Sequence, residues 1–310
     1  MANVSNRILQ ILLIALLIPS FGLADDNDVR LTDDRGQPLR LSGPATRPAA
    51  ISTFGADVAL ALGVSPVAVT DYGIQGAPEY LADQLGEVPR LGPRHQPNLE
   101  LLSEVQPDLV LAIRRYTEKD GAQIEAIAPL LALDLITLED SERAVKLAGV
   151  ALGASPEAEK LNARFLNRIE ALAQHSEEAG TKTVAVLTSG SETPFIYHDH
   201  FLPTALLERL GFDNVGGMTP NPDSGIPLGY RISLEALLEL DPDIIILLPT
   251  NRQRAFTLSP VWPYLKAVRD SSVHEVPHYW KEGAGPIARA RILDDIQRLL
   301  LEVPAAEPGE

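Results

Sequence analysis

One segment of this chain occurs twice. Residues 98–112 read NLELLSEVQPDLVLA and residues 233–247 read SLEALLELDPDIIIL, so the copies lie 135 positions apart and are identical at six of fifteen positions. In each copy an amphipathic helical pattern ends at Pro-Asp and continues directly into an apolar run, because proline cannot supply the amide proton that a helix needs. Two unrelated helix–turn–strand units are the alternative, but the glutamates shared at equal positions favour a duplicated lobe.

The apolar runs around each copy alternate with helical patterns. Strands are predicted at 49–51, 66–69, 183–188, 244–248 and 273–276, and helices at 55–62, 124–133, 144–152, 202–210 and 287–301. Such alternation is typical of α/β proteins, in which a mainly parallel sheet has helices on both faces.

A single long helical pattern, residues 155–180, separates the two copies. Ser155 and the proline after it are typical of a helix start, and Gly180 is typical of a helix end. Between them, apolar residues from Leu161 to Leu172 recur at spacings of three or four, as one face of a helix requires. At 1.5 Å per residue this helix is roughly 30–35 Å long. The sequence therefore predicts an α/β fold of two lobes joined by one long helix.

These patterns divide the chain into six segments. They are a signal peptide at 1–24, a hairpin at 25–47, an N-terminal lobe at 48–154, a connecting helix at 155–180, a C-terminal lobe at 181–301 and a flexible tail at 302–310. The hairpin is predicted from Val29–Thr32 and Pro38–Leu41, which flank the turn sequence Asp-Asp-Arg-Gly. The tail is predicted from its prolines and its terminal position.

The first 24 residues have the pattern of a secretory signal peptide. Arg7 precedes an apolar run at 8–19, and Gly22-Leu23-Ala24 supplies small residues before a cut after Ala24. A membrane anchor is the alternative, but the run is shorter than the ~20 residues that span a bilayer. The sequence has no cysteine, which excludes disulfides and a lipid-modified cysteine at the cut. We therefore expect a secreted, soluble periplasmic protein.

The chain is acidic, with 26 basic and 42 acidic residues and a net charge of −16. Nucleic acid is therefore not an expected partner. A site for an anion would have to gather its cations locally, against the field of the whole protein.

Cationic and aromatic residues collect where the predicted strands end, which is where open parallel sheets bind ligands. In the order of the chain they are Tyr72, Arg94, Arg114, Arg115, Tyr116, Arg252, Arg254, Tyr279, Trp280 and Lys281. Arginine pairs well with carboxylates, and aromatic rings offer flat apolar surface to a bulky guest. A single loop arginine is more often merely solvated. As a group, however, these residues predict a cleft between the lobes that binds a bulky anion.

Two sharper chemical interpretations are weaker. His198-Asp199-His200 places two imidazoles close together, but zinc needs three or four converging ligands. Ser189-Gly190-Ser191 lacks the Gly-x-Ser-x-Gly elbow of a serine hydrolase. We therefore expect no metal bound directly by the protein, no cofactor and no enzymatic activity. A periplasmic enzyme that uses the cleft for metal-assisted hydrolysis stays the alternative from another class.

The order of these features resembles the periplasmic substrate-binding proteins of ABC importers, in the branch that takes up ferric siderophores, ferric dicitrate, haem or cobalamin. The resemblance rests on the signal peptide, the hairpin, the paired Leu-Glu…Pro-Asp segments, the long helix and the run Trp280–Pro286, WKEGAGP. It implies two Rossmann-like lobes joined by one rigid helix, with ligand captured between them and modest closure. It also implies a monomer that delivers its ligand to a permease dimer at the inner membrane.

The resemblance also implies roles for residues. Arg114 or Arg115, and Arg252, fall where siderophore-binding relatives carry basic contacts, and the run 279–281 falls where some relatives contribute aromatic contacts. Many siderophore binders have an arginine just before the helix that here follows Phe201, and this chain has none. A ferric siderophore is the expected ligand, with haem and cobalamin as alternatives.

Glu100 and Glu235 lie at equal positions in the two repeats, each in the first turn of its predicted helix. The resemblance implies that such a pair docks onto the two subunits of the permease. Ordinary helix capping, with Asn98 and Ser233 as the caps, is the alternative.

Overall fold

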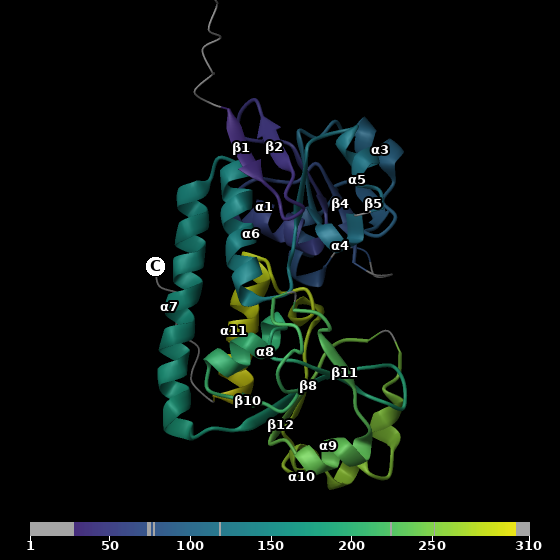
Figure 1. Ribbon diagram of the computed structural model, residues 1–310, viewed down its shortest axis with the longest axis vertical. Helices are drawn as coiled ribbons and strands as arrows, with labels where there is room; N and C mark the ends of the chain where they lie inside the picture. Colours follow the sequence, from purple (N-terminus) through teal and green to yellow (C-terminus); the bar gives the residue numbers. More distant parts are fainter. Residues whose placement is uncertain are drawn as a thin grey trace, which may run out of the picture.

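The computed structural model describes residues 28–301 except 73–75, 77, 118, 224 and 251, and the side chains of 177–179 are also not described. Figure 1 shows two α/β lobes, one above the other, with the long helix α7 running beside both. The expected signal peptide at 1–24 and flexible tail at 302–310 lie outside the described residues.

The N-terminal lobe is built on a five-stranded parallel sheet of order β5-β4-β3-β6-β7, with the antiparallel hairpin β1-β2 beside it. Its elements are β1 (Val29–Thr32), β2 (Pro38–Leu41), β3 (Pro48–Ile51), α1 (Thr53–Ala61), β4 (Ala68–Asp71), η1 (Glu79–Leu81), α2 (Ala82–Leu85), β5 (Arg90–Pro93), α3 (Leu99–Glu104), β6 (Leu109–Ile113), α4 (Arg114–Thr117), α5 (Gly121–Glu125), β7 (Leu130–Leu133) and α6 (Leu138–Ala151). The central strands β3 and β6 are wholly buried, as strands covered on both faces must be.

The C-terminal lobe has a mixed sheet of order β11-β9-β8-β12-β13, in which β8, β12 and β13 run parallel and β9 and β11 antiparallel. Its elements are β8 (Thr183–Thr188), β9 (Phe195–Tyr197), α8 (Leu202–Arg209), β10 (Asp213–Asn214), β11 (Gly229–Arg231), α9 (Leu234–Leu240), β12 (Ile244–Leu247), η2 (Ala255–Leu258), η3 (Trp262–Tyr264), α10 (Lys266–Arg269), β13 (Val273–Glu275), η4 (His278–Trp280) and α11 (Pro286–Leu300). The short strand β10 pairs with β8 in parallel.

The connecting helix α7 (Ser155–Ala179) has 25 residues, which is about 37 Å at 1.5 Å per residue. Its apolar face buries Phe165 and Leu172 against neighbouring helices, and its main packing partners are α6 and α11. It begins at Ser155 as expected, with Ala154 rather than Ser155 at the capping position. Gly180 ends it with a positive φ of 79°.

The predicted helix at 124–133 is wrong beyond its first two residues, because α5 ends at Glu125. Residues Leu130–Leu133 form β7, an edge strand of the first sheet that is buried along its whole length and pairs with β6. Four consecutive apolar residues fit a buried strand as well as a buried helix, so periodicity alone does not separate the two.

The last helix, α11, belongs to the second half of the sequence but packs on α1 and α7 as well as on η4. In Figure 1 it lies between the two lobes, behind α8. The segment between η4 and α11, residues 281–285, is thereby placed at the junction of the lobes. Among the described helices, none is long and apolar enough to cross a membrane.

Candidate ligand-binding cleft

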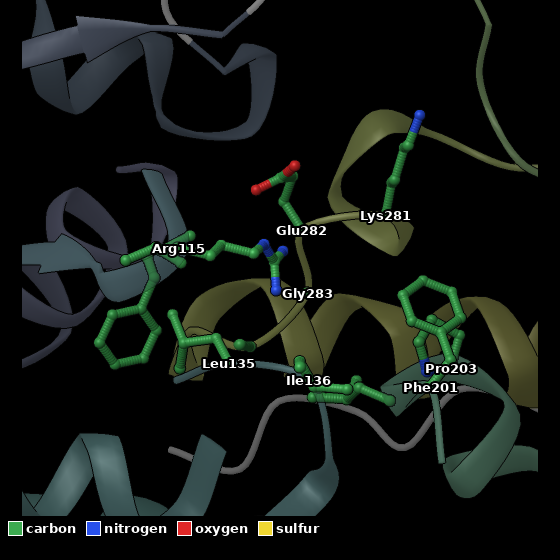
Figure 2. Close-up of a pocket in the computed structure, with 12 residues that line it drawn as sticks. Arg115, Leu135, Ile136, Phe201, Pro203, Lys281, Glu282 and Gly283 are labelled. Atoms are coloured by element: carbon green, nitrogen blue, oxygen red, sulfur yellow. The ribbon is translucent and has the colours of Figure 1, made fainter. Parts of the chain in front are cut away.

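A hollow lies where the two lobes and the segment before α11 meet (Figure 2). Its lining residues are Phe54, Ile113, Arg115, Leu135 and Ile136 from the first half of the chain, and Phe201, Leu202, Pro203, Lys281, Glu282, Gly283 and Ala284 from the second. The cavity volume is about 20 Å³, close to the room that one water needs. We therefore treat this hollow as the floor of a cleft rather than as the whole site, and call it the cleft floor.

An ion pair joins the two sides above the cleft floor. Arg94, which follows β5, donates from Nη1 to Glu282 Oε2 at 2.6 Å, although the two residues are 188 positions apart. The two side chains are only 22% and 9% exposed. Burial lowers the pKa of Arg94, but the charge of Glu282 and its hydrogen bond outweigh this and raise it. Arg94 is therefore a permanent cation that a carboxylate of the protein already neutralises.

Tyr116 lies between two guanidinium groups. Arg94 donates from Nη2 to the Tyr116 hydroxyl at 3.1 Å, and its guanidinium carbon lies 4.1 Å from the centre of the ring. The Arg115 guanidinium is 4.9 Å from the same ring. Figure 2 shows Arg115 reaching from the N-terminal lobe toward the segment that carries Glu282 and Gly283. Tyr116 thus holds Arg115 beside the cleft floor through a cation–π contact.

Other aromatic rings surround the same region. Tyr72, which follows β4, packs edge-on against His278 at 5.2 Å between ring centres. Tyr197, at the end of β9, stacks on Phe201 at 4.2 Å. Burial and then the Glu282 charge raise the pKa of Tyr72, and the same causes raise the pKa of Tyr197 to about 12. Both phenols therefore stay protonated at neutral pH and can donate hydrogen bonds to a guest.

Two more of the predicted arginines are bound by carboxylates of the protein. Arg114 donates from Nε to Asp134, the residue after β7, at 2.9 Å. Arg254 donates to Glu275 at 2.9 Å and to the carbonyl oxygen of Leu248 at 3.0 Å, and its side chain is only 14% exposed. These contacts hold the ends of neighbouring strands together.

Trp280 lies inside the protein, so its ring offers no exposed surface to the cleft. Its side chain is fully buried, and the indole nitrogen donates to Asp295 Oδ2 at 2.9 Å. The hydroxyl of Tyr279 donates to the same oxygen at 2.6 Å, and its ring packs edge-on against Tyr80. Both residues fasten η4 to α11. The last member of the run, Lys281, lines the cleft floor, but Figure 2 shows its amine pointing away from Ile136.

Arg252 belongs to the C-terminal lobe, where it follows the end of β12, and its side chain is exposed. Its side chain passes so close to Gly190 that a Cβ at that glycine would collide with it. Gly190 is flanked by Ser189 and Ser191, whose hydroxyl oxygens lie 2.8 Å apart. Over the residues that the structure describes, no carboxylate pairs with Arg252 or with Arg115.

No group of three histidine or acidic side chains that could hold a metal ion occurs among the described residues. His198 is buried, and its Nδ1 lies 2.9 Å from the carbonyl oxygen of Gly216. Its ring packs near Tyr230, at 5.3 Å between centres. Of the two imidazoles that the sequence places close together, that of His198 is therefore engaged in contacts within the protein.

Glu100 and Glu235 are both exposed, each in the first turn of its short helix. The caps expected from the sequence are present. Asn98 accepts a hydrogen bond from the amide of Leu101, and Ser233 accepts one from the amide of Ala236. Neither glutamate has a role in these caps, so docking stays a prediction.

The sequence analysis missed Glu282, Tyr197 and Asp134. Glu282 stands in the run WKEGAGP, where an acidic residue beside a predicted anion site was a visible signal. Tyr197 ends a three-residue strand, which was too short to predict from its pattern. Asp134 follows the strand that the sequence analysis assigned to a helix.

Known proteins resemble this chain both in sequence and in structure. A model of the periplasmic binding protein family matches residues 49–279. The "Probable siderophore-binding lipoprotein YfiY" of Bacillus subtilis is 27% identical over 274 residues, with 81% of each chain covered. The achromobactin-binding periplasmic protein of Dickeya dadantii is 26% identical over 256 residues, with 78% of this chain and 82% of that protein covered. Staphylococcus aureus SirA, solved with staphyloferrin B, superposes with a TM-score of 0.75 at 24% identity, covering 87% and 98% of the two chains.

Proposed function

Because this chain belongs to the periplasmic binding protein family, we propose that it captures an anionic ferric siderophore between its two lobes and delivers it to the permease of an ABC importer. The relatives named for siderophores match most of this chain, which supports an iron chelate as the ligand. The connecting helix α7 acts as a rigid link, so capture involves only modest closure of the lobes.

The observation that carries this proposal is the division of the arginines into two groups. Arg94, Arg114 and Arg254 are paired with carboxylates of the protein. Arg115 and Arg252 lie at the ends of corresponding strands in the two lobes and have no such partner among the described residues. On a chain with a net charge of −16, two arginines without a carboxylate partner, one from each lobe, support a proposed anion site. The planar guanidinium suits the carboxylate or other oxygen groups of a chelate.

The ligand contacts proposed here are therefore fewer than the ten residues that the sequence suggests. Arg115 and Arg252 supply charge, with Lys281 at the rim. Tyr72 and Tyr116 supply ring surface and a hydroxyl donor. Of the remaining predicted residues, Arg94 holds Tyr116, and the others make contacts within their own lobe or with α11.

The location and partners follow from the same proposal. Residues 1–24 direct export and are removed after Ala24, and the mature protein acts as a periplasmic monomer on a permease dimer. The relatives are named as periplasmic proteins or lipoproteins, which supports a place outside the cytoplasmic membrane. N-terminal sequencing of the exported protein checks the cut, and a retained apolar segment would contradict it.

The binding test compares the wild type with the Arg115→Ala/Arg252→Ala variant. Charge-assisted hydrogen bonds contribute about 1.5–3 kcal/mol each, so each substitution should weaken binding roughly tenfold to a hundredfold. Isothermal titration with ferric siderophores, ferric dicitrate, haem and cobalamin measures this. Arg209→Ala is the matched control, because Arg209 pairs with Glu139 between α6 and α8 and does not line the cleft floor.

Three outcomes would overturn parts of the proposal. Unchanged affinity in the double variant would place the site elsewhere. Tight binding of haem or cobalamin without binding of any ferric chelate would change the ligand class. Stoichiometric zinc in the purified protein, together with hydrolysis of an ester or phosphate substrate, would favour an enzyme.

A further inference from the structure

Glu282 is the one acidic side chain among the residues that line the cleft floor. Its side chain is 9% exposed, and its carboxylate accepts a hydrogen bond from Arg94. Its negative charge contributes to the raised pKa of Tyr72, Tyr80 and Tyr197, so the carboxylate acts on several rings around the cleft. Burying a carboxylate costs free energy, and its charge also repels an anionic ligand, so its presence at this site needs a reason.

The backbone around Glu282 is fixed in place. On one side, Trp280 is anchored to α11 through Asp295. On the other side, a Cβ at Gly283 would collide with Ile292 of α11, so this segment lies directly on that helix. The carbonyl oxygen of Ala284 then accepts a hydrogen bond from Ser141 Oγ of α6 at 2.6 Å. The carboxylate is thus held at the cleft floor from both ends of its segment.

Its partner is equally fixed. The guanidinium of Arg94 stacks on the Tyr116 ring, and its second nitrogen donates to the Tyr116 hydroxyl. An incoming chelate therefore meets a preformed neutral pair at this point, while Arg115 and Arg252 keep their positive charge.

We infer that Glu282 is a built-in counter-anion that neutralises Arg94 and thereby limits the negative charge of the chelate that the cleft accepts. This inference rests on the proposed function and concerns its selectivity. Charge pairs at half-buried sites are screened only weakly by salt, so a carboxylate at this position discriminates between chelates of different charge. Specificity of this kind comes from a repulsive element placed beside the attractive ones.

The test replaces Glu282 with glutamine, which keeps the shape and an oxygen acceptor for Arg94 but removes the charge. The probes are ferric dicitrate, which is multiply anionic, and a neutral ferric trihydroxamate, each titrated calorimetrically. We expect Glu282→Gln to strengthen binding of ferric dicitrate about tenfold and to leave the neutral chelate within twofold of its wild-type behaviour. Glu282→Asp keeps the charge and should keep the wild-type ratio of the two affinities.

Two further variants separate this effect from general ones. Glu125→Gln removes the same unit of charge from an ion pair with Arg35 on the hairpin side, outside the cleft floor, and should change neither affinity. Adding Arg94→Gln to Glu282→Gln should cancel the gain, because the gain comes from the released arginine. Such a cycle measures the coupling between the two residues directly.

The outcomes distinguish this inference from the function on which it rests. If the wild type binds no ferric chelate, the proposed function is wrong and the inference falls with it. If the wild type binds ferric dicitrate and Glu282→Gln binds it no more tightly, only the inference is overturned. An equal gain for both chelates, or a gain that persists without Arg94, would also overturn it, because neither depends on the charge of the ligand at this pair.

Discussion

In each lobe the central strand begins at an aspartate that holds the neighbouring strand. Asp108, before β6, accepts hydrogen bonds from the amide and hydroxyl of Thr46 at 2.7 and 3.2 Å. Asp243, before β12, accepts them from the amide and hydroxyl of Thr183 at 2.8 and 2.9 Å. The turns that lead into these aspartates are alike as well, because both contain a non-glycine residue with positive φ two positions earlier.

The carboxyl ends of the same strands differ. After β6 the chain turns at once into α4, which presents Arg115 and Tyr116, whereas Arg252, between β12 and η2, lies over a glycine. Backbone groups at the start of a buried strand must be hydrogen-bonded, and both lobes meet this requirement with an aspartate at the same position. The loops after strand ends vary more, and in proteins of this architecture they are where ligands bind. We therefore infer that the shared half of each lobe is structural, and we predict that the divergent half selects the guest.

The lobes also differ in how they hold α11, and this difference gives the largest expected effect of a substitution on the stability of the protein. Helices α1 and α8 are each followed by a glycine with positive φ, Gly63 and Gly211. Six positions before these glycines stand Asp57 in α1 and Ala205 in α8. Asp57 is fully buried and accepts hydrogen bonds from the first amides of α11 and from the Tyr80 hydroxyl, at 2.8–2.9 Å. The N-terminal lobe thus holds the start of α11 by a buried carboxylate, whereas Ala205 offers no such group at the matched position of α8.

Replacing Asp57 with alanine should therefore destabilise the protein strongly. Three buried donors would lose their acceptor, at about 1–3 kcal/mol each, so we expect a loss of at least about 3 kcal/mol in urea unfolding. Ala205→Ser, the matched change in α8, should cost less than about 1 kcal/mol. A similar loss for both variants would mean that the two helices are held alike.

The pH dependence of Asp57 sharpens this test. Burial raises the pKa of Asp57 to about 6, despite the hydrogen bonds and the charge of Arg289 that lower it. The folded state therefore keeps this proton up to a higher pH than the unfolded state, and the stability it contributes is lost as pH rises from about 4 to about 6. In Asp57→Asn, unfolding free energies measured across this range should lack that loss. An unchanged slope would contradict the assignment to Asp57.

The sequence predicted those parts of the fold that depend on neighbouring residues. The long helix, the hairpin and both repeats were found because their periodicity and turn residues are local. The strand β7 was missed because a short apolar run has no period. In the site, the positions of the arginines were predicted, but their partners were not. Arg94 meets Glu282 across 188 positions, and the burial of Trp280 depends on α11; only tertiary packing creates such contacts.

The second expected effect concerns Glu100 and Glu235, where the lobes are alike on their exposed surface. If the pair docks on a two-fold permease, Glu100→Ala/Glu235→Ala should reduce uptake and stimulation of the transporter ATPase about tenfold while ligand affinity stays the same. Single exposed ion pairs contribute only about 0–1 kcal/mol, but two together orient and steer the encounter. Glu104→Ala/Glu239→Ala, at the next matched pair of the repeats, is the control. Undiminished uptake would mean that Glu100 and Glu235 do not take part in docking and only stabilise the N-termini of their own helices.

The smallest expected effect lies at the matched aspartates themselves. Asp243 pairs with the exposed Lys266, and this hydrogen bond, together with that from Thr183, lowers the pKa of Asp243 to about 2. The folded state thus releases this proton more readily than the unfolded state, so the stability from Asp243 is present above about pH 4 and lost as pH falls toward 2. Lys266→Gln should raise the pKa of Asp243 toward its usual range and move the acid-unfolding midpoint slightly upward, as followed by circular dichroism.

Arg47→Gln is the control in the other lobe, because Asp108 is bound by the backbone amide of Arg47 while the Arg47 guanidinium donates to the carbonyl oxygens of Val105 and Gln106. Arg47→Gln should therefore leave the acid midpoint where it is, and equal shifts in the two variants would mean that the strand starts are alike in charge as well as in hydrogen bonding.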